Sequence, residues 1–383
     1  MDDFVLAGDE TMHSTFWHDL GKRILIDDIG DLGRFLGRHH TTVKCGNEER
    51  FAFDMRAYAK DIVQEYATLT GTTVFRKSSA PFLAKVAEQL DELEEAEGQL
   101  ASSASSILMK LMWIARLARP DVLRATTWLA TKIHSWGRAC NSHLHRIMCY
   151  SYHTQNDLLT GWIADEPKDI YVERFVDADF CGDEQDCYST SGGWIQLTGA
   201  ATQFPLAWIS KKQSTVARST TEAETAALNF VLFEEGLPLL ELFKVLLGPS
   251  TRLNVREDNE ATAKVVASGY SKKLRYLKRT QKISLSSLAE ELNKEDVSLS
   301  LVRSLDQKAD VFTKAVAGPL WVNAMKLMAL VREYTVISSS QTGLKLTIDF
   351  SQALCQTATP GVRTGYKKRQ KRKPQRIPPY SKE

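Results

Sequence analysis

The chain has 383 residues, of which 43% are hydrophobic and 25% are charged, and its 49 basic and 47 acidic side chains leave a formal net charge of +2. This composition excludes an intrinsically disordered protein and makes local charge more informative than net charge. The six cysteines form no CxxC pair, so neither a zinc site nor a disulfide framework is predicted. An acidic start without a long apolar run predicts an intracellular protein with no membrane contact.

The part of the chain before residue 166 divides into two stretches. Residues 1–40 predict a hairpin, a short helix and a further strand, with glycines between brief apolar runs. Between residues 46 and 165 the pattern is mostly helical, and its acidic stretch 88–97 is interpreted as a solvated face. The pattern changes at Asp165-Glu166-Pro167, and we predict a domain boundary there.

Beyond this boundary, strand and helix patterns alternate, which predicts an α/β domain over residues 166–330. No internal repeat is evident. The expected strands cover 170–180, 192–197, 204–210, 252–256 and 297–303, and the expected helices cover 219–247 with a break near Gly236, the residues up to Gly269, 284–293, and the stretch from Asp306 onward.

Glu224 is the acid that a structural role explains least. Ser219 and Glu222 match the S-x-x-E capping box at a helix start, so Glu222 already has a structural role. Glu224 instead lies in line with Leu228 and Val231, and a carboxylate on that apolar stripe is costly to desolvate without a cation or metal. Glu224 is therefore a candidate metal ligand, and the alternative is an ordinary residue at the edge of the stripe.

Three further acids stand at the ends or junctions of predicted elements, where structural explanations compete with functional ones. Asp177 ends an alternating strand and shares its face with Asp179, which also suits an end-of-strand turn. Asp258 follows a strand and precedes a helix, which Asp258 or Asn259 can cap. Asp310 stands on the last predicted helix, four residues before a lysine, which predicts a solvated ion pair.

The joint arrangement of these acids is more informative than any one of them. One lies on the first strand, one on the first helix, one after the fourth strand and one on the last helix. With the residues around them, they resemble the ribonuclease H domain of copia-type retrotransposons. The matching motifs are Asp177-Ala178-Asp179-Phe180 with Gly182-Asp183, Ser189-Thr190-Ser191-Gly192-Gly193, Trp208-Ile209-Ser210-Lys211-Lys212-Gln213, Ser219-Thr220-Thr221-Glu222-Ala223-Glu224, Glu257-Asp258-Asn259 and Ala309-Asp310-Val311-Phe312-Thr313-Lys314.

This resemblance implies an α/β fold of the ribonuclease H type, with a five-stranded mixed sheet and flanking helices. It also implies that the catalytic, metal-binding carboxylates are Asp177, Glu224, Asp258 and Asp310. Two Mg²⁺ ions about 4 Å apart, which Mn²⁺ can replace, would activate water and stabilise the leaving oxygen of a phosphodiester. The expected activity is endonucleolytic hydrolysis of the RNA strand of RNA–DNA hybrids, without base readout.

Polar residues around these motifs are candidates for nucleic-acid binding, with ordinary solvated side chains as the alternative. The candidates are Lys211, Lys212, Arg218, Ser189, Thr190 and Asn259. No histidine follows His153, so a histidine that assists product release in some members of the fold has no counterpart. Residues 271–280 carry a basic segment in place of the usual lysine–histidine pair, and this segment is either a hybrid-binding face or a solvated helix surface.

The first residues resemble another part of the same polyproteins. Asp2 and Asp3 match the aspartate pair of a reverse transcriptase palm hairpin, and residues 20–37 and 118–122 are similar to later polymerase segments. We therefore expect a palm remnant followed by a mostly helical thumb or connection segment. Because a further palm aspartate and the fingers would precede Met1, we expect Asp2 and Asp3 to be vestigial and polymerase activity to be missing. Either a truncated gene copy or a start that is assigned too late would explain why these segments are missing.

The last residues are basic and rich in proline, which predicts a disordered tail that binds phosphates, directs nuclear import or only aids solubility. Expected partners are an RNA–DNA hybrid and other Pol polyprotein segments, in a cytoplasmic particle or the nucleus. The alternative function is a catalytically inactive nucleic-acid-binding remnant, whereas a transposase or integrase of the same general fold is disfavoured. The predicted division is a palm remnant at 1–45, a thumb or connection segment at 46–165, a ribonuclease H-like domain at 166–330, a C-terminal extension at 331–358 and a basic tail at 359–383.

Overall fold

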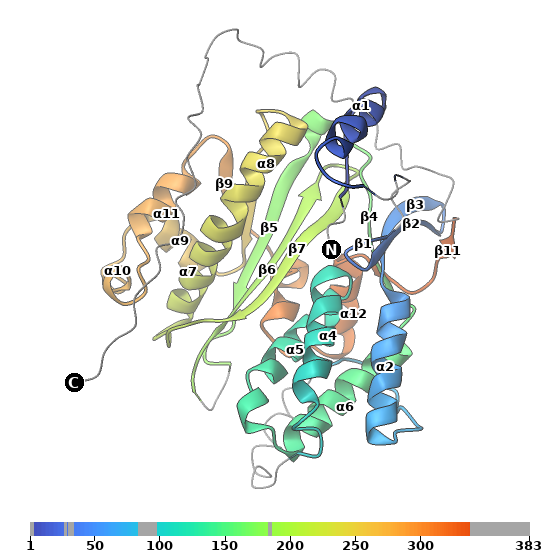
Figure 1. Ribbon diagram of the computed structural model, residues 1–383. Coiled ribbons are helices and arrows are strands. Elements are labelled where there is room, and N and C mark those ends of the chain that lie inside the picture. Colours follow the sequence, from blue (N-terminus) through green and yellow to red (C-terminus); the bar gives the residue numbers. More distant parts are fainter. Residues whose placement is uncertain (1–3, 27–28, 30–33, 83–97, 183–185, 338–383) are drawn as a thin grey trace, which may run out of the picture.

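Two β-sheets with helices packed around them make up the part of the chain that the computed structural model describes (Figure 1). The described residues are 4–26, 29, 34–82, 98–182 and 186–337. The predictions for Asp2, Asp3, the acidic stretch 88–97 and the basic tail lie outside these residues.

The first sheet combines strands from distant parts of the sequence, and all of its pairings are antiparallel. Sequence analysis did not predict this sheet. Three of its strands are only two residues long, and most of their partners are far away in the chain, so no local alternation marks them. Its order is β1 (Arg34–Phe35), β2 (Arg38–Cys45), β3 (Glu48–Asp54), β4 (Leu158–Gly161) and β10 (Leu330–Val331), and β11 (Thr335–Val336) pairs with β2.

The first half is otherwise helical, as its periodicity predicts. Its helices are α1 (Glu10–Gly21), α2 (Arg56–Thr70), α4 (Ala104–Leu117), α5 (Leu123–Ala130) and α6 (Arg138–His153). The hairpin expected at the start is wrong for residues 4–9, which form no strand. Helix α1 begins directly after them, at Glu10, because the Asp9 side chain caps the helix by accepting a hydrogen bond from the Thr11 N–H at 2.9 Å.

The second sheet has five strands and is mixed, which confirms the predicted α/β class. Strand β6 pairs antiparallel with both β5 and β7. On the other side of β5, strands β8 and β9 extend the sheet in parallel. The order across the sheet is β7 (Gln203–Lys212), β6 (Thr190–Thr198), β5 (Tyr171–Ala178), β8 (Leu253–Glu257) and β9 (Val297–Leu301).

Helices α7 (Thr220–Phe230) and α8 (Leu237–Leu247) form one long rod in which Val231–Gly236 is a π-helical stretch, at the break predicted from the sequence. The final helix predicted from Asp306 is wrong. Residues 304–306 and 310–312 form short 3-10 turns, because the Gln307 side chain accepts the Ala309 N–H at 3.2 Å and so competes with a regular helix. The remaining helices are α9 (Glu260–Ser268), α10 (Leu277–Thr280), α11 (Leu285–Leu292) and α12 (Gly318–Leu327).

Strand β5 is buried on both faces of the sheet. Val172 and Val176 belong to the core shared with α7 and α8, whereas Phe175 joins a core formed with the helices of the first half. Figure 1 shows α7 and α8 on one side of this sheet and α4 and α5 on the other. The carboxyl end of β5 is therefore held rigidly between two layers of helices.

Candidate metal centre

Three acids meet where two neighbouring strands end. Strands β5 and β8 run parallel with Phe175 beside Arg256, so Asp177 and Asp258, each two residues further on, reach the same edge of the sheet. Glu224 comes to this edge from α7, which packs on β5. One carboxylate oxygen from each of the three acids lies within 4.8 Å of the other two. We call these three residues the acid cluster.

The start of α7 determines where Glu224 lies. The Ser219 hydroxyl accepts a hydrogen bond from the Glu222 N–H at 3.2 Å, and the Glu222 carboxylate accepts one from the Arg218 N–H at 2.8 Å. The structural role predicted for Glu222 is thereby confirmed. Glu224 itself is 5% exposed, and its Oε2 has no hydrogen-bond partner among the described residues.

Burial is the main cause that raises the pKa of Glu224 to about 10, and the negative charges of Asp177, Glu257 and Asp258 add to it. Burial likewise raises the pKa of Asp177. A carboxylate that is both desolvated and surrounded by like charges retains its proton unless a cation replaces it. The cluster is therefore poised to bind either protons or a metal.

Lys314 joins Asp310 to the acid cluster. Its Nζ donates to Asp177 Oδ1 at 2.9 Å and to Asp310 Oδ1 at 2.8 Å. The ion pair predicted four residues apart is therefore present, but it also includes Asp177, and it starts from a 3-10 turn instead of a helix. Burial and the charge of Asp177 raise the pKa of Asp310 to about 6.

Asp258 does not cap α9; Asn259 does, by accepting a hydrogen bond from the Thr262 N–H at 3.0 Å. Asp258 is held from another segment, since it accepts hydrogen bonds from Ser304 Oγ at 3.1 Å and from Gln307 Nε2 at 3.5 Å. The same Gln307 amide donates to the Val176 carbonyl at 2.9 Å, next to Asp177. Gln307 thus fixes the spacing between two of the clustered acids.

Glu257 is an acid that sequence analysis did not single out. It is fully buried at the end of β8, and burial raises its pKa well above the ordinary value. Its Oε1 accepts the Asn259 N–H at 3.0 Å, and its Oε2 has no partner within the described part of the chain. The sequence offers one signal for it. Strand β8 is buried at alternate positions, and Glu257 occupies the last of these, directly before Asp258.

The three basic candidates for nucleic-acid binding lie at or near the surface. Lys211 is exposed and its Nζ lies 4.2 Å from the centre of the Phe230 ring. Lys212 is half-buried and forms an ion pair with Asp186 at 2.5 Å. Arg218 is exposed just before α7. Lys211 and Lys212 end β7, and Arg218 precedes α7, so all three lie near the start of the helix that carries Glu224.

The three polar candidates are used within the chain. Ser189 is buried and its hydroxyl accepts the Cys181 N–H at 3.2 Å. Thr190 is buried as well, and its N–H donates to Asp179. Asn259 caps α9, as described above. Asp179 itself pairs with an arginine of α5 and is not one of the clustered acids.

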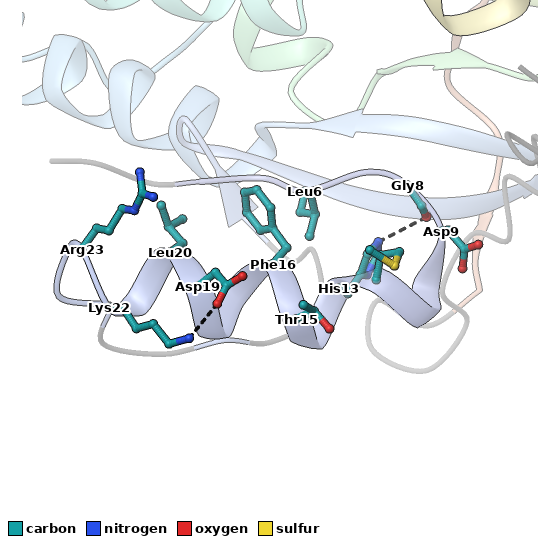
Figure 2. A pocket seen from close by; sticks show the side chains of 11 residues that line it. Leu6, Gly8, Asp9, His13, Thr15, Phe16, Asp19, Leu20, Lys22 and Arg23 are labelled. Carbon is teal, nitrogen blue, oxygen red and sulfur yellow. Dashed lines mark hydrogen bonds and ion pairs between the residues drawn. The ribbon is translucent and has the colours of Figure 1, made fainter. Parts of the chain in front are cut away.

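A pocket of about 610 Å³ lies far from these residues in the sequence, between α1 and the extended residues before it (Figure 2). Phe16 and Leu20 of α1 line it together with Leu6, and His13 Nε2 lies 3.2 Å from the Gly8 carbonyl oxygen. Among the predicted site residues that the structure describes, none contributes to this pocket.

A helix both long and apolar enough to cross a membrane is absent from the described residues. Comparison with known proteins finds relatives among transposon polyproteins. The chain is 28% identical over 228 residues to the retrovirus-related Pol polyprotein from transposon RE1 of Arabidopsis thaliana, a match covering 58% of this chain and 14% of that protein. It is 24% identical over 320 residues to the corresponding polyprotein from transposon TNT 1-94 of Nicotiana tabacum, a match covering 82% of this chain and 23% of that protein.

A shorter relative is the secreted RxLR effector protein 161 of Plasmopara viticola, which is 34% identical over 122 residues, or 31% of this chain and 79% of that protein. No protein-family model matches the chain, and no solved structure gives a significant match. The chain spans less than a quarter of the length of the Pol polyproteins it matches. These polyproteins match up to 82% of the chain, which confirms the predicted resemblance of the chain to the retrovirus-related Pol polyproteins of copia-type transposons.

Proposed function

We propose that this chain hydrolyses the RNA strand of RNA–DNA hybrids, with two divalent metal ions bound at the acid cluster. The observation that carries the proposal is the convergence of Asp177, Glu224 and Asp258, whose oxygens lie within 4.8 Å of one another. A buried Glu224 oxygen without a hydrogen-bond partner among the described residues fits a metal ligand. Hard carboxylate oxygens are the ligands that Mg²⁺ and Mn²⁺ prefer.

When bound, two such ions supply an activated water and stabilise the leaving oxygen of the cleaved phosphodiester. The chain holds the ligands for them: Asp177, Glu224 and Asp258 supply oxygens from β5, α7 and the end of β8. Asp310 is the fourth candidate ligand, and it lies at the more exposed side, where its side chain is 25% exposed. The two layers of helices around β5 keep these oxygens in place before substrate arrives.

The substrate class follows from the family and from the charges near the cluster. Lys211, Lys212 and Arg218 can contact phosphates of either strand, which gives affinity without reading the bases. Discrimination for RNA would come from contacts with its 2′-hydroxyls and with the groove of the hybrid. Cleavage is accordingly expected to depend little on sequence.

The arrangement of strands supports a ribonuclease H-like architecture for residues 166–330. Three antiparallel strands are followed by two parallel ones, with the acids at one edge. The similarity to Pol polyproteins supports a reverse transcriptase palm, thumb or connection origin for the first half. In this proposal the chain works beside other Pol segments, in a cytoplasmic particle or in the nucleus.

The test is cleavage of a labelled RNA–DNA hybrid by the purified chain in Mg²⁺. We expect only the RNA strand to be cut, and we expect Glu224→Gln and Asp258→Asn to lower the rate by at least about a hundredfold, because each removes a metal ligand. Glu290→Gln, which makes the same change on an exposed residue of α11, should leave the rate unchanged.

Chelation by EDTA should stop the reaction as well. If the chain binds the hybrid but leaves it intact in both Mg²⁺ and Mn²⁺, a catalytically inactive nucleic-acid-binding remnant replaces the nuclease. If the DNA strand is cut instead, the transposase or integrase alternative gains support. Circular dichroism of each variant separates a loss of chemistry from a loss of folding.

A further inference from the structure

Lys314 places its ammonium group between two of the proposed metal ligands. Its Nζ lies 2.9 Å from Asp177 Oδ1 and 2.8 Å from Asp310 Oδ1. Asp177 also belongs to the acid cluster, so the ammonium stands at the border of the space that the three acids surround. A single positive charge of the chain itself therefore occupies part of the place where a cation is expected.

The residues of this bridge differ in how freely they can move. The Asp177 side chain is 1% exposed and also accepts a hydrogen bond from the Thr313 hydroxyl, whereas the Lys314 side chain is 45% exposed. Water reaches the Lys314 end of this bridge, and holding its long side chain in one position costs conformational entropy. Lys314 can therefore swing into solvent while Asp177 keeps its position.

We propose that Lys314 is a built-in competitor for the metal. In the metal-free chain its ammonium neutralises Asp177 and Asp310, and it must leave before a divalent ion can take the same oxygens. This inference rests on the metal site proposed above. The competition multiplies the apparent affinity for metal by the fraction of molecules in which the lysine is undocked.

The opposite role is also physically possible and predicts the opposite sign. If Lys314 served to hold Asp177 and Asp310 in place for the metal, its removal would leave two acids that repel each other and would weaken metal binding. If it competes, removal frees ligand oxygens and tightens metal binding. The sign of the change in affinity therefore separates the two roles without any measurement of cleavage.

The experiment is titration of the purified, metal-free chain with MnCl₂ by isothermal titration calorimetry, without nucleic acid. We expect Lys314→Met to bind Mn²⁺ about tenfold more tightly than wild type. Lys314→Gln, which keeps an N–H donor for the carboxylates, should also tighten binding and serves if the methionine variant does not fold.

Lys244 offers a matched control, because its Nζ also bridges two carboxylates, at 2.7 Å from Glu241 and 2.6 Å from Asp296. Asp296 precedes β9, at the other end of the sheet from the acid cluster. Lys244→Met removes the same charge and should leave Mn²⁺ affinity unchanged. Any general effect of net charge would appear in both variants.

A second measurement is thermal unfolding of each variant with and without Mn²⁺. Lys314→Met should lower the melting temperature of the metal-free chain, and saturating Mn²⁺ should restore it. Unchanged or weaker Mn²⁺ binding in both Lys314 variants would overturn the inference but leave the metal site standing. Failure of wild type and of both variants to bind Mn²⁺ would overturn the proposed metal site itself.

Discussion

Two regions of this chain bury charged side chains: one buries a pair of opposite charges, and the other buries a cluster of like charges. In the first half, Arg119 and Asp121 are 4% and 3% exposed, and each guanidinium nitrogen has an acceptor on Asp121 or Thr154. In the acid cluster, carboxylates face one another and a Glu224 oxygen has no partner in the described part of the chain. The charges of Arg119 and Asp121 are therefore neutralised by each other, whereas the negative charges of the acid cluster are neutralised only by bound protons or cations.

Neither burial nor an unmet hydrogen bond alone marks a functional site. Arg174 on β5 is fully buried and its three guanidinium nitrogens have no hydrogen-bond partner among the described residues, yet the charge that acts on its pKa is that of one acid, Glu235, of the opposite sign. Burial is the main cause that lowers its pKa to about 9. The acid cluster differs because several desolvated groups of one sign converge, an arrangement that only protons or cations make stable.

The largest effect is expected where the buried charges are complementary. Arg119→Met should lower the free energy of unfolding by about 3–5 kcal/mol, because it leaves the Asp121 carboxylate buried without its partner. Chemical denaturation of the metal-free chain measures this change. Adding Asp121→Leu to the same variant should recover much of the loss, since it removes the unpaired charge. A loss below about 1 kcal/mol for the single variant would show that the pair is not buried as described.

A smaller effect is expected from metal at the acid cluster. At a hundredfold excess over its dissociation constant, Mg²⁺ should stabilise the wild-type chain by about 2.7 kcal/mol, and Glu224→Gln should lose this gain. Because burial raises the pKa of Glu224 to about 10, the residue is protonated at neutral pH without metal, and the substitution should change metal-free stability little.

Thermal unfolding with and without Mg²⁺ measures both parts of this prediction. Arg119→Met should keep the Mg²⁺-dependent gain despite its lower stability, because the Arg119–Asp121 pair is not part of the cluster. An equal gain in wild type and Glu224→Gln would mean that Mg²⁺ binds elsewhere.

The acids that the sequence marks are those with a recognisable local position. Asp177 ends an alternating strand, Glu224 follows a capping box on an apolar stripe, and Asp258 stands between a strand and a helix. The structure brings these three together because β5 and β8 are parallel neighbours and α7 packs on the same sheet. Local pattern made these three acids candidates but left structural alternatives open, and the resemblance to the copia-type ribonuclease H domain selected them. The topology of the sheet then determines their convergence.

The residues that sequence analysis missed depend on contacts between distant segments. Gln307 donates to the carbonyl of Val176, which lies 131 residues earlier, and the second contact of Lys314, with Asp177, is also absent from any local pattern. The first sheet was missed for the same reason, since β10 and β11 pair with strands from the first half. Periodicity reports which face of an element is buried, but it does not report which partner covers that face.

The smallest effects are expected from the pH dependence that single groups contribute, and one group from each region contributes with the opposite sign. Burial, followed by the charge of Asp177, raises the pKa of Asp310 from its ordinary 3.8 to about 6, so the folded chain holds more protons there than the unfolded chain between these values. Burial, followed by the charge of Arg146, lowers the pKa of His143 from 6.5 to about 4, so the unfolded chain holds more protons at that residue.

Stability rises with pH wherever the unfolded chain binds more protons. Between about pH 4 and pH 6, Asp310 should therefore make the metal-free chain less stable as pH rises, whereas His143 should make it more stable. Relative to wild type, Asp310→Asn should make the slope of stability against pH more positive and His143→Gln should make it more negative, measured by the denaturation midpoint at half-unit steps of pH. Slopes that stay the same in both variants would show that neither group titrates differently on folding, and the contrast between the two regions would then not extend to proton binding.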